Sequence, residues 1–325
     1  MKHLEVSFAG LNLRNPFIVS SCSLTNTVEK NLRWEEAGAG ALVLKSLFEE
    51  EIEAESASME QGIHTEETDY LRTYYRANRL DHYLQLIAQT KKKCSIPVIA
   101  SINCFRNSEW TDFAFHIANA GADALELNVM SVCSDDDYVY GSYEQRHIEI
   151  VERIKRTVDI PVIVKLGRNF TNPIPLIKQL YAHGVAAVVL FNRMASMDIR
   201  VDKLTYTHGD IWGHPSDLYE VLRWTGITSA HIPSLDLAAS GGVVDGEAMV
   251  KSLLAGASAV EVCTSLYRNG SSVIGGMLEY LTNWMQSHHY TSIDQFRGLM
   301  NARQQHASDR FERVQFFKNY SLRDD

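Results

Sequence analysis

Residues 120–128 read AGADALELN, and this stretch decides the fold because its pattern returns three more times along the chain. A glycine precedes a short gap and an apolar run in residues 37–46, 183–192 and 255–264, and the residue before it is alanine except for His183. Glycine commonly ends a helix, and the short apolar run that follows it is typical of a strand buried on both faces. Each of the four segments therefore predicts the end of a helix and then a buried strand.

A second pattern, in which a proline opens an apolar run, lies between these segments. It occurs at Pro16, Pro97, Pro161 and Pro233, and residues 160–164 (IPVIV) are a typical example. Proline at the first position of a strand costs no hydrogen bond of the sheet, and it ends the preceding helix. The two patterns together predict eight strands with helical stretches between them.

Eight strands that alternate with helices predict a parallel sheet closed into a (β/α)8 TIM barrel. A doubly wound open sheet is the alternative, but the fourfold glycine pattern favours the closed barrel. We expect the barrel to span residues 1–298 and a helical C-terminal extension to span residues 299–325.

Two long segments interrupt the regular pattern. Residues 47–80 and 193–216 both follow predicted strands, so we expect them as insertions over the C-terminal face, where active sites of such barrels form. Near the end of the chain, residues 272–287 read as an amphipathic helix, and the charged tail from Ser292 onward also reads as helical.

Composition excludes several classes of protein. The chain has 325 residues, 45% of them hydrophobic, and a formal net charge of −9, which argues against binding nucleic acid through basic patches. No apolar run approaches the roughly 18 residues of a membrane span and no signal peptide is visible, so we expect a soluble cytoplasmic protein. The five cysteines form no CxxC pair and the twelve histidines show no HxH or HExxH spacing. Neither a disulfide framework nor a metal site is therefore expected.

Polar residues follow the predicted strands, at the end of the barrel where the chemistry of this fold takes place. An unpaired ammonium inside a barrel is costly, so Lys165 is predicted to face a ligand. Lys45 is interpreted in the same way, with pairing to Glu49 or Glu50 as the alternative. In chain order the strand-end residues are Ser20, Ser21, Lys45, Ser46, Asn103, Asn128, Lys165, Asn192, Ser240, Gly241, Gly242, Thr264 and Ser265.

The loops after the last two strands predict a phosphate site. In barrels of this type these loops hold an anion with backbone amides and a helix N-terminus. Gly242 allows close approach of the backbone, and Thr264 and Ser265 supply hydroxyl donors. A ligand that carries a phosphate is therefore expected.

Several motifs occur together in an order that resembles a known family. They are Asn15-Pro16-Phe17 with Ser20-Ser21, Lys45-Ser46, Glu126-Leu127-Asn128, Val164-Lys165-Leu166, Ala239 to Val243, and Gly256-Ala257 through Thr264-Ser265-Leu266. From about Leu4 to Gly298 the chain resembles the dihydroorotate dehydrogenases of the soluble class, which are FMN-dependent barrels.

The resemblance implies an FMN whose phosphate lies on Gly241, Gly242, Thr264 and Ser265. It implies that Lys45 and Lys165 lie near the isoalloxazine, where positive charge favours the anionic reduced flavin. Asn103 and Asn128 would hydrogen-bond the flavin or the substrate, and the serines at positions 20, 21, 46 and 240 would complete the cofactor site. The family's soluble members also suggest a homodimer, and a separate electron-transfer protein is a possible partner.

The chain departs from the family mainly where the substrate would bind. The family's Asn-Leu-Ser-Cys-Pro-Asn reads NVMSVC in residues 128–133, which puts Ser131 in the place of the family's cysteine base. Ser131 is therefore predicted to abstract the proton, with Cys133 as the rival base. After the sixth strand the chain reads Asn192-Arg193, and Arg193 could hold an acidic substrate with two hydrogen bonds. The family's Asn-rich substrate loop has no counterpart in residues 70–78.

The expected function is an FMN-dependent oxidoreductase that oxidises dihydroorotate to orotate, or a related small acid, by hydride transfer to flavin N5. Because the substrate motifs depart further than the cofactor motifs, a flavin-binding barrel without dihydroorotate turnover is a second reading. A lyase that uses Lys165 as a Schiff-base nucleophile is the third. Fumarate, NAD through an iron–sulfur partner, and other carriers all stay open as the electron acceptor.

Overall fold

Eight parallel strands close into a barrel in the computed structural model, which describes residues 4–48, 65–103, 110–134, 136–194 and 196–304. The last strand pairs with the first, so the ring has no open edge, and the predicted (β/α)8 TIM barrel is confirmed. Around the barrel the strands are β3 (Phe17–Val19), β4 (Ala41–Val43), β6 (Val98–Asn103), β7 (Ala124–Val129), β8 (Val162–Leu166), β9 (Ala187–Leu190), β12 (Asp236–Ser240) and β13 (Ala259–Val262).

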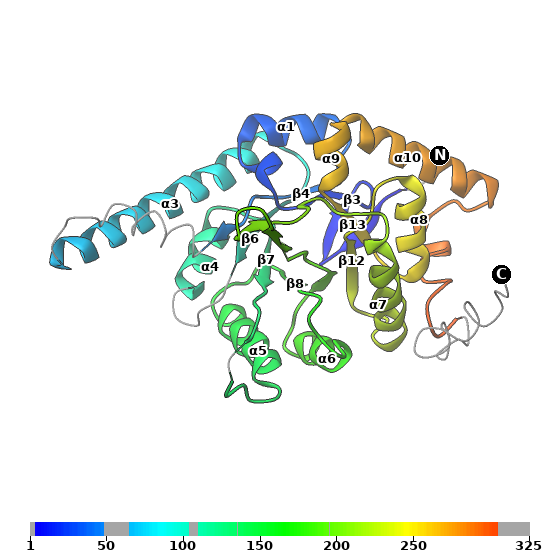
Figure 1. Cartoon of the computed structure of the whole chain (residues 1–325). Helices are drawn as coiled ribbons and strands as arrows, with labels where there is room; N and C mark the ends of the chain where they lie inside the picture. The colour runs from blue at the N-terminus through cyan, green and yellow to red at the C-terminus, as the bar shows by residue number, and fades with distance from the viewer. Residues whose placement is uncertain (1–3, 49–64, 104–109, 135, 195, 305–325) are drawn as a thin grey trace.

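Helices surround the strands as an outer ring, and α3 extends beyond that ring (Figure 1). Local signals explain their ends: the Asp245 side chain accepts the Ala248 N–H at the start of α8, and Gly256 follows its last residue. The helices are α1 (Val28–Glu36), α3 (Thr65–Lys93), α4 (Trp110–Asn119), α5 (Ser142–Lys155), α6 (Ile174–Ala182), α7 (Asp217–His231), α8 (Gly246–Ala255), α9 (Thr264–Asn269) and α10 (Ser272–Ser287).

The glycine pattern has the predicted role in all four places. Gly38, Gly121, Gly184 and Gly256 each follow a helix and precede a barrel strand, and each adopts a positive φ, which ranges from 84° to 116°. This backbone conformation is strained for residues with a side chain. The repeat therefore marks the turns from α1, α4, α6 and α8 into the next strand.

The proline pattern holds at three of its four sites. Pro16, Pro97 and Pro161 directly precede β3, β6 and β8. Pro233 differs, because the Leu235 N–H donates to the Ile232 carbonyl at 3.1 Å and forms a turn first. As a result β12 begins at Asp236, three residues after the proline.

Only part of each insertion lies within the described residues. The first insertion contributes β5 (Leu47–Phe48), which pairs with β6, and the beginning of α3. Residues 49–64 lie outside the described residues, and with them the proposed partners of Lys45, Glu49 and Glu50. The second insertion forms an antiparallel hairpin of β10 (Met197–Arg200) and β11 (Thr205–His208) after the carboxyl end of β9.

The C-terminal part of the chain agrees with one prediction and departs from another. The predicted helix over residues 272–287 is α10. From Ser292 to Gln304 the chain forms a short 3-10 helix (Ile293–Gln295) and turns, so the described part of the tail is not the α-helix expected there. Residues 305–325 lie outside the described residues, and the helical extension over 299–325 stays a prediction.

A hairpin of β1 (Val6–Phe8) and β2 (Leu11–Leu13) lies at the amino-terminal end of the barrel. The Ala9 N–H donates to the Asp236 carboxylate at the start of β12, and Phe8 is fully buried. Because this end is closed by the hairpin, the opposite end of the strands is the open side of the barrel.

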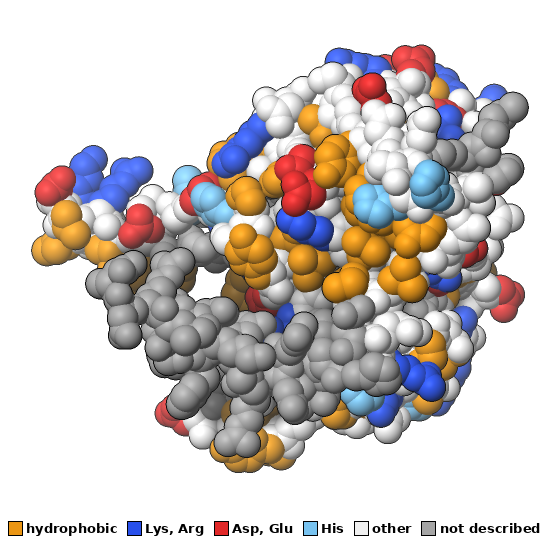
Figure 2. Space-filling model, turned by 90° about the vertical axis from the view of Figure 1, so that its right-hand side faces the viewer, with side chains coloured by type: hydrophobic (Ala, Val, Ile, Leu, Met, Phe, Trp, Pro, Cys, Tyr) orange, Lys and Arg blue, Asp and Glu red, His pale blue; other side chains and the backbone are white. Residues whose placement is uncertain are grey.

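The outer surface carries both signs of charge. Acidic, basic and hydrophobic side chains are interspersed on the face shown in Figure 2. Within the described residues, no helix is both long and apolar enough to cross a bilayer.

The turn between α1 and β4 provides a test of the fold. A methyl group on Gly40 would overlap the backbone carbonyl oxygen of Asn15, so we expect Gly40→Ala to lower the free energy of unfolding by about 1–3 kcal/mol. Gly275→Ala is the matched control, because nothing lies near its added methyl on the exposed face of α10 and alanine favours helix. Urea unfolding of both variants checks this, and equal stability of the two would contradict the packing described.

Candidate active site at the carboxyl ends of the strands

A cavity of about 210 Å³ lies at the open end of the barrel. It is bounded by the carboxyl ends of β3, β8, β9, β12 and β13 and by part of the loop that precedes α7. The structure brings together here, out of the residues predicted from the sequence, Ser20, Ser21, Lys165, Asn192, Arg193, Ser240, Gly241, Gly242 and Thr264.

Polar residues at equivalent positions of the repeats meet at the floor of this cavity and below it. Ser20, Ser101 and Lys165 each follow a strand-opening proline by four residues. Glu126 and Glu261 each follow a repeat glycine by five residues. Equivalent positions of a barrel point into the same interior layers, and here the five side chains form one buried group.

Lys165 is paired with two buried carboxyl groups. Its Nζ lies 2.6 Å from Glu261 Oε2 and 3.8 Å from Glu126 Oε1, and it donates to Ser20 Oγ at 3.0 Å. The Ser20 hydroxyl in turn donates to Glu261 Oε2 at 2.9 Å. The sequence argument that Lys165 is unpaired is therefore wrong, because it left out the acidic residues inside β7 and β13.

The charges of this cluster follow from its burial. Burial raises the pKa of Glu126 well above its ordinary value, and the nearby Glu261 carboxylate raises it further. Burial also opposes the charges of Lys165 and Glu261, but each is the other's counter-ion, so the pKa of Lys165 is raised and the pKa of Glu261 is lowered. These directions favour an ammonium on Lys165, a carboxylate on Glu261 and a protonated Glu126.

A chain of hydrogen bonds joins the cluster to the strand ends on the other side of the barrel. Ser46 Oγ lies 2.9 Å from Ser21 Oγ and 2.8 Å from Ser101 Oγ. The Asn128 amide donates to Ser46 Oγ at 3.1 Å, and its oxygen accepts the Asn192 amide at 3.0 Å. Ser46 and Asn128 are therefore fixed in orientation next to the cavity, although they are not part of its lining.

The other end of the cavity is formed by the turn after β12. Gly241 and Gly242 adopt φ values of +104° and +73°, and a methyl group on Gly242 would overlap the backbone N of Leu218 at the start of α7. A methyl group on Gly241 would lie 2.8 Å from Arg168 Nη2. The backbone at this turn therefore approaches both α7 and the Arg168 guanidinium closely.

Arg168 has buried hydrogen-bond donors for which the described residues supply no acceptor. Its Nη1 pairs with Asp217 at 3.2 Å, but Nε and Nη2 have no partner there. Although burial opposes the charge of Asp217, the His214 N–H and the Arg168 guanidinium lower its pKa. Buried donors without partners are costly, so the position beside Gly241 fits an anionic ligand such as a phosphate group.

Of the two hydroxyls predicted as donors for the phosphate, the Ser265 proton is already in use and the Thr264 proton is not. Thr264 Oγ1 accepts the Gly213 N–H at 3.0 Å, which leaves its own proton free for another acceptor. Ser265 is buried and donates to the Val244 carbonyl at 3.1 Å, so its side chain joins the two loops instead of facing the cavity.

The two candidate bases follow β7. The Ser131 N–H donates to Tyr143 Oη at 3.2 Å and its carbonyl accepts the Asn169 amide at 3.0 Å, which fixes this loop. Ser131 and Cys133 are both half-buried. Neither lies in the described lining of the cavity.

Two further predicted residues lie at strand ends outside the described lining. Lys45 is half-buried after β4. Asn103 ends β6, in register with Asn128 of β7. Their placement agrees with the expected end of the barrel, and their roles stay predictions.

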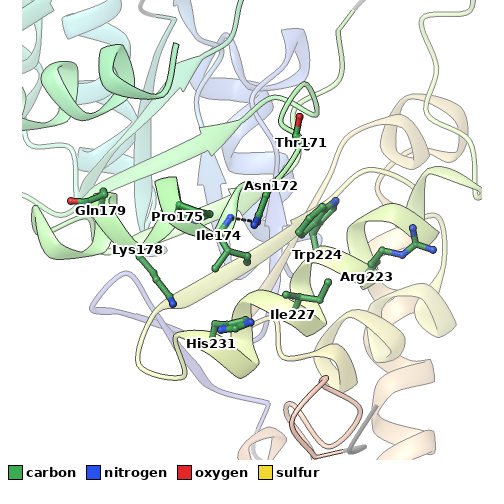
Figure 3. Close-up of a pocket in the computed structure, with 10 residues that line it drawn as sticks. All are labelled: Thr171, Asn172, Ile174, Pro175, Lys178, Gln179, Arg223, Trp224, Ile227 and His231. Carbon is green, nitrogen blue, oxygen red and sulfur yellow. Dashed lines mark hydrogen bonds between the residues drawn. The ribbon is translucent and has the colours of Figure 1, made fainter. Parts of the chain in front are cut away.

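A larger hollow of about 770 Å³ lies outside the barrel between α6 and α7 (Figure 3). Its lining includes Lys178, Trp224 and His231, and it contains no barrel strand end. Lys178 and His231 are exposed to solvent. The smaller cavity is therefore the candidate site, because only there do buried polar groups from several strands converge.

Sequence reasoning left out Glu126, Glu261 and Arg168 as site residues. The signal for the two glutamates is a single acidic residue inside an apolar strand, in Leu125-Glu126-Leu127 and in Val260-Glu261-Val262. A charged residue in such a run is buried only when it is paired. Arg168 follows β8 by two residues and carries no comparable signal.

Comparison with known proteins agrees with this geometry. The family model for dihydroorotate dehydrogenase matches residues 3–285. The chain belongs to the dihydroorotate dehydrogenase family. It is thus an oxidoreductase of the dihydroorotate dehydrogenase type.

Relatives within and near this family have different substrates in their names. The catalytic subunit of dihydroorotate dehydrogenase B (NAD(+)) from Thermoplasma acidophilum is 28% identical over 92% of this chain and 99% of its own length. The subunit of the same name from Pyrococcus abyssi is 29% identical over 91% and 98%. Subunit PreA of the NAD-dependent dihydropyrimidine dehydrogenase of Escherichia coli is 23% identical over 92% and 77%.

The raised pKa of Glu126 in this dihydroorotate dehydrogenase family member gives a pH-dependent test. Because its pKa is raised on folding, the folded state binds more protons than the unfolded state, and wild-type stability falls as pH rises above about 4.3. Glu126→Gln lacks this loss, so its stability relative to wild type should increase from pH 5 to pH 8.

Urea unfolding at several pH values measures this difference, with Glu247→Gln on the exposed side of α8 as the control. The control should show a much flatter difference. A Glu126→Gln variant whose relative stability falls with pH would mean that Glu126 is ionised in the folded protein.

Proposed function

We propose that the chain is an FMN-dependent oxidoreductase that oxidises dihydroorotate, or a closely related small acid, by hydride transfer to flavin N5. The observation that carries the proposal is the single cavity in which Lys165, Ser20, the Gly241-Gly242 turn and Thr264 meet. These residues come from strands far apart in the sequence and belong to the predicted cofactor set. FMN would supply the acceptor for the hydride, and the residues of the chain bind, orient and exchange protons.

The phosphate end of the cofactor would lie at the turn after β12. Gly241 and Gly242 allow close approach of the backbone, and Thr264 Oγ1 has a proton to donate. The unused Nε and Nη2 of Arg168 add buried cationic donors beside the same turn. A guanidinium suits a phosphate because it offers several donors in one plane.

The isoalloxazine end would lie over Lys165 and the hydrogen-bonded amides. Lys165 is fixed by Ser20 and Glu261, so its ammonium cannot turn away without losing both partners. Asn128 and Asn192 hold each other in one orientation at 3.0 Å. Such fixed donors support the orientation of a planar heterocycle.

Arg193 supports an acidic substrate. Its Nη2 donates to the Asp210 carbonyl at 2.9 Å, while the buried Nη1 has no hydrogen-bond partner among the described residues. Nη1 lies 3.9 Å from Asp217, so this carboxylate positions the guanidinium without occupying it fully. A carboxylate on the substrate would satisfy the remaining donor.

The structure disfavours the lyase reading. A lysine that forms a Schiff base must be neutral to attack a carbonyl group. Lys165 is held as an ammonium by Glu261 at 2.6 Å, and its pKa is raised because Glu126 and Glu261 outweigh the effect of burial. We therefore do not propose Schiff-base chemistry at this residue.

Anaerobic addition of dihydroorotate to the purified protein tests the proposal. We expect a yellow protein whose extracted flavin is FMN and whose visible flavin absorbance falls when dihydroorotate is added. Ser131→Ala should slow this reduction by about 10²–10⁴-fold as a general base does, and Cys133→Ala should not. The reverse result would make Cys133 the base.

Bound FMN that dihydroorotate does not reduce would instead favour a flavin protein with another substrate. In that case a panel of small cyclic acids and dihydropyrimidines identifies the reductant. A protein that binds no flavin contradicts the proposal entirely.

Arg168 gives a test of where the phosphate lies. Arg168→Ala should weaken FMN by about 10- to 100-fold, which corresponds to a charged hydrogen bond of about 1.5–3 kcal/mol. It should leave riboflavin nearly unchanged, since riboflavin lacks the phosphate. Fluorescence titration of the apoprotein with both flavins measures the two effects, and Arg223→Ala at the outer hollow is the control. An equal loss for both flavins would remove Arg168 from the phosphate site.

A further inference from the structure

The proposed function uses the positive charge of Lys165 but does not account for two carboxyl groups beside it. One glutamate is enough to balance one lysine. Glu126 and Glu261 come from β7 and β13, and both side chains are almost fully buried, with 0% and 1% exposed. Retaining a second buried carboxyl group costs free energy unless its charge is removed by a proton.

The unpaired oxygens of the two glutamates show where protons can bind. Glu126 Oε2 and Glu261 Oε1 are buried and have no hydrogen-bond partner among the described residues, whereas the other oxygen of each faces Lys165 or a serine. The two carboxyl groups face one ammonium, so a single proton on the pair makes the cluster neutral. One further proton can therefore be accepted by the pair.

The cluster is electrically neutral with one proton and positive with two. Glu261 and Lys165 line the cavity, so the charge of the cluster acts directly on whatever lies above it. A negative charge placed in the cavity is stabilised if Lys165 loses its internal counter-ion at that moment. An unbalanced charge is costly in surroundings of low dielectric constant. A negative charge that enters the cavity is therefore accompanied by a proton that binds to the glutamate pair.

We propose that Glu126 and Glu261 form a proton-exchange site that balances the charge of Lys165. The pair holds one proton while the cavity is uncharged, and it binds a second proton when a negative charge arrives over Lys165. The inference rests on the proposed function, since reduced FMN is that negative charge. In the balanced step two electrons and one proton enter the flavin, and a proton from solvent forms a new O–H bond on a glutamate oxygen.

Other titratable groups near the cluster have to be distinguished from the two glutamates as proton acceptors. Tyr83 of α3 keeps its proton, because burial raises its pKa. The thiols of Cys22, after β3, and Cys263, after β13, both interact with Lys165. The pKa of Cys263 is raised by its contact with Cys22 and by burial, and the pKa of Cys22 is lowered by that contact, so Cys22 is the group to control for.

The midpoint potential of bound FMN as a function of pH tests the proposal. Equilibration with a redox dye between about pH 7.5 and pH 9 avoids carboxyl and imidazole groups of ordinary pKa. Uptake of two protons with two electrons gives a slope of about 59 mV per pH unit, and uptake of one gives about 30 mV. We expect about 59 mV for the wild type and for Cys22→Ser.

Variants of the two glutamates identify the acceptor. Glu126→Gln and Glu261→Gln each keep one carboxyl group able to accept a proton, so each should keep the steep slope. The double variant has no carboxyl group left in the cluster, so its midpoint potential should change by about 30 mV per pH unit. It should also gain at least tenfold in affinity for reduced FMN relative to oxidised FMN, which corresponds to a rise of about 30 mV in the midpoint potential. A purely structural role would not distinguish the single variants from the double variant in this way.

The results separate the two proposals. A protein that binds no FMN fails the proposed function, and the inference falls with it. A protein that binds FMN with a wild-type slope of about 30 mV overturns the inference alone, and this holds even if the double variant does not fold. An unchanged slope in the double variant means that the second proton binds elsewhere, and it also overturns the inference. A reduced-flavin spectrum that differs between the double variant and the wild type has the same consequence.

Discussion

The pairing of β13 with β3 closes the barrel, and the candidate site depends on this closure. Glu261 lies opposite Ile18 in this pair, and the Ser20 N–H donates to the Val262 carbonyl at 3.0 Å just beyond it. The first and last strands thereby bring the Ser20 hydroxyl to the Glu261 carboxylate, and both to Lys165 of β8. Because the strands are parallel, their carboxyl ends all face one side, while the β1–β2 hairpin closes the other.

The sequence predicted the barrel well because its signals are local. A glycine with positive φ at the end of α1, α4, α6 and α8 and a proline before β3, β6 and β8 are properties of single turns. The start of β12 was misplaced because a turn at Ile232 separates the proline from the strand, and no composition rule gives the length of that turn. From Ser292 to Gln304 the chain is not the expected α-helix for a related reason: charged residues favour several surface conformations, and packing chooses among them.

The site was predictable as a set of strand ends but not as a network. Residues such as Lys165 and Gly241 were found because they follow apolar runs, which fixes their end of the barrel. The partners of Lys165 could not be found that way, because Glu126, Glu261 and Lys165 are distant in sequence and meet only through strand register. Ser265 shows the converse error: its position was right, but its hydroxyl is taken by the Val244 carbonyl.

We expect FMN to bind in the cavity above the Glu126–Lys165–Glu261 cluster, and a crystal structure of the protein with FMN would show this directly. The phosphate should lie beside Gly241, Gly242 and Arg168, with the isoalloxazine over Lys165 and within hydrogen-bond distance of its ammonium. Density for FMN in the outer hollow near Trp224, or a cavity that stays empty at saturating FMN, would contradict it.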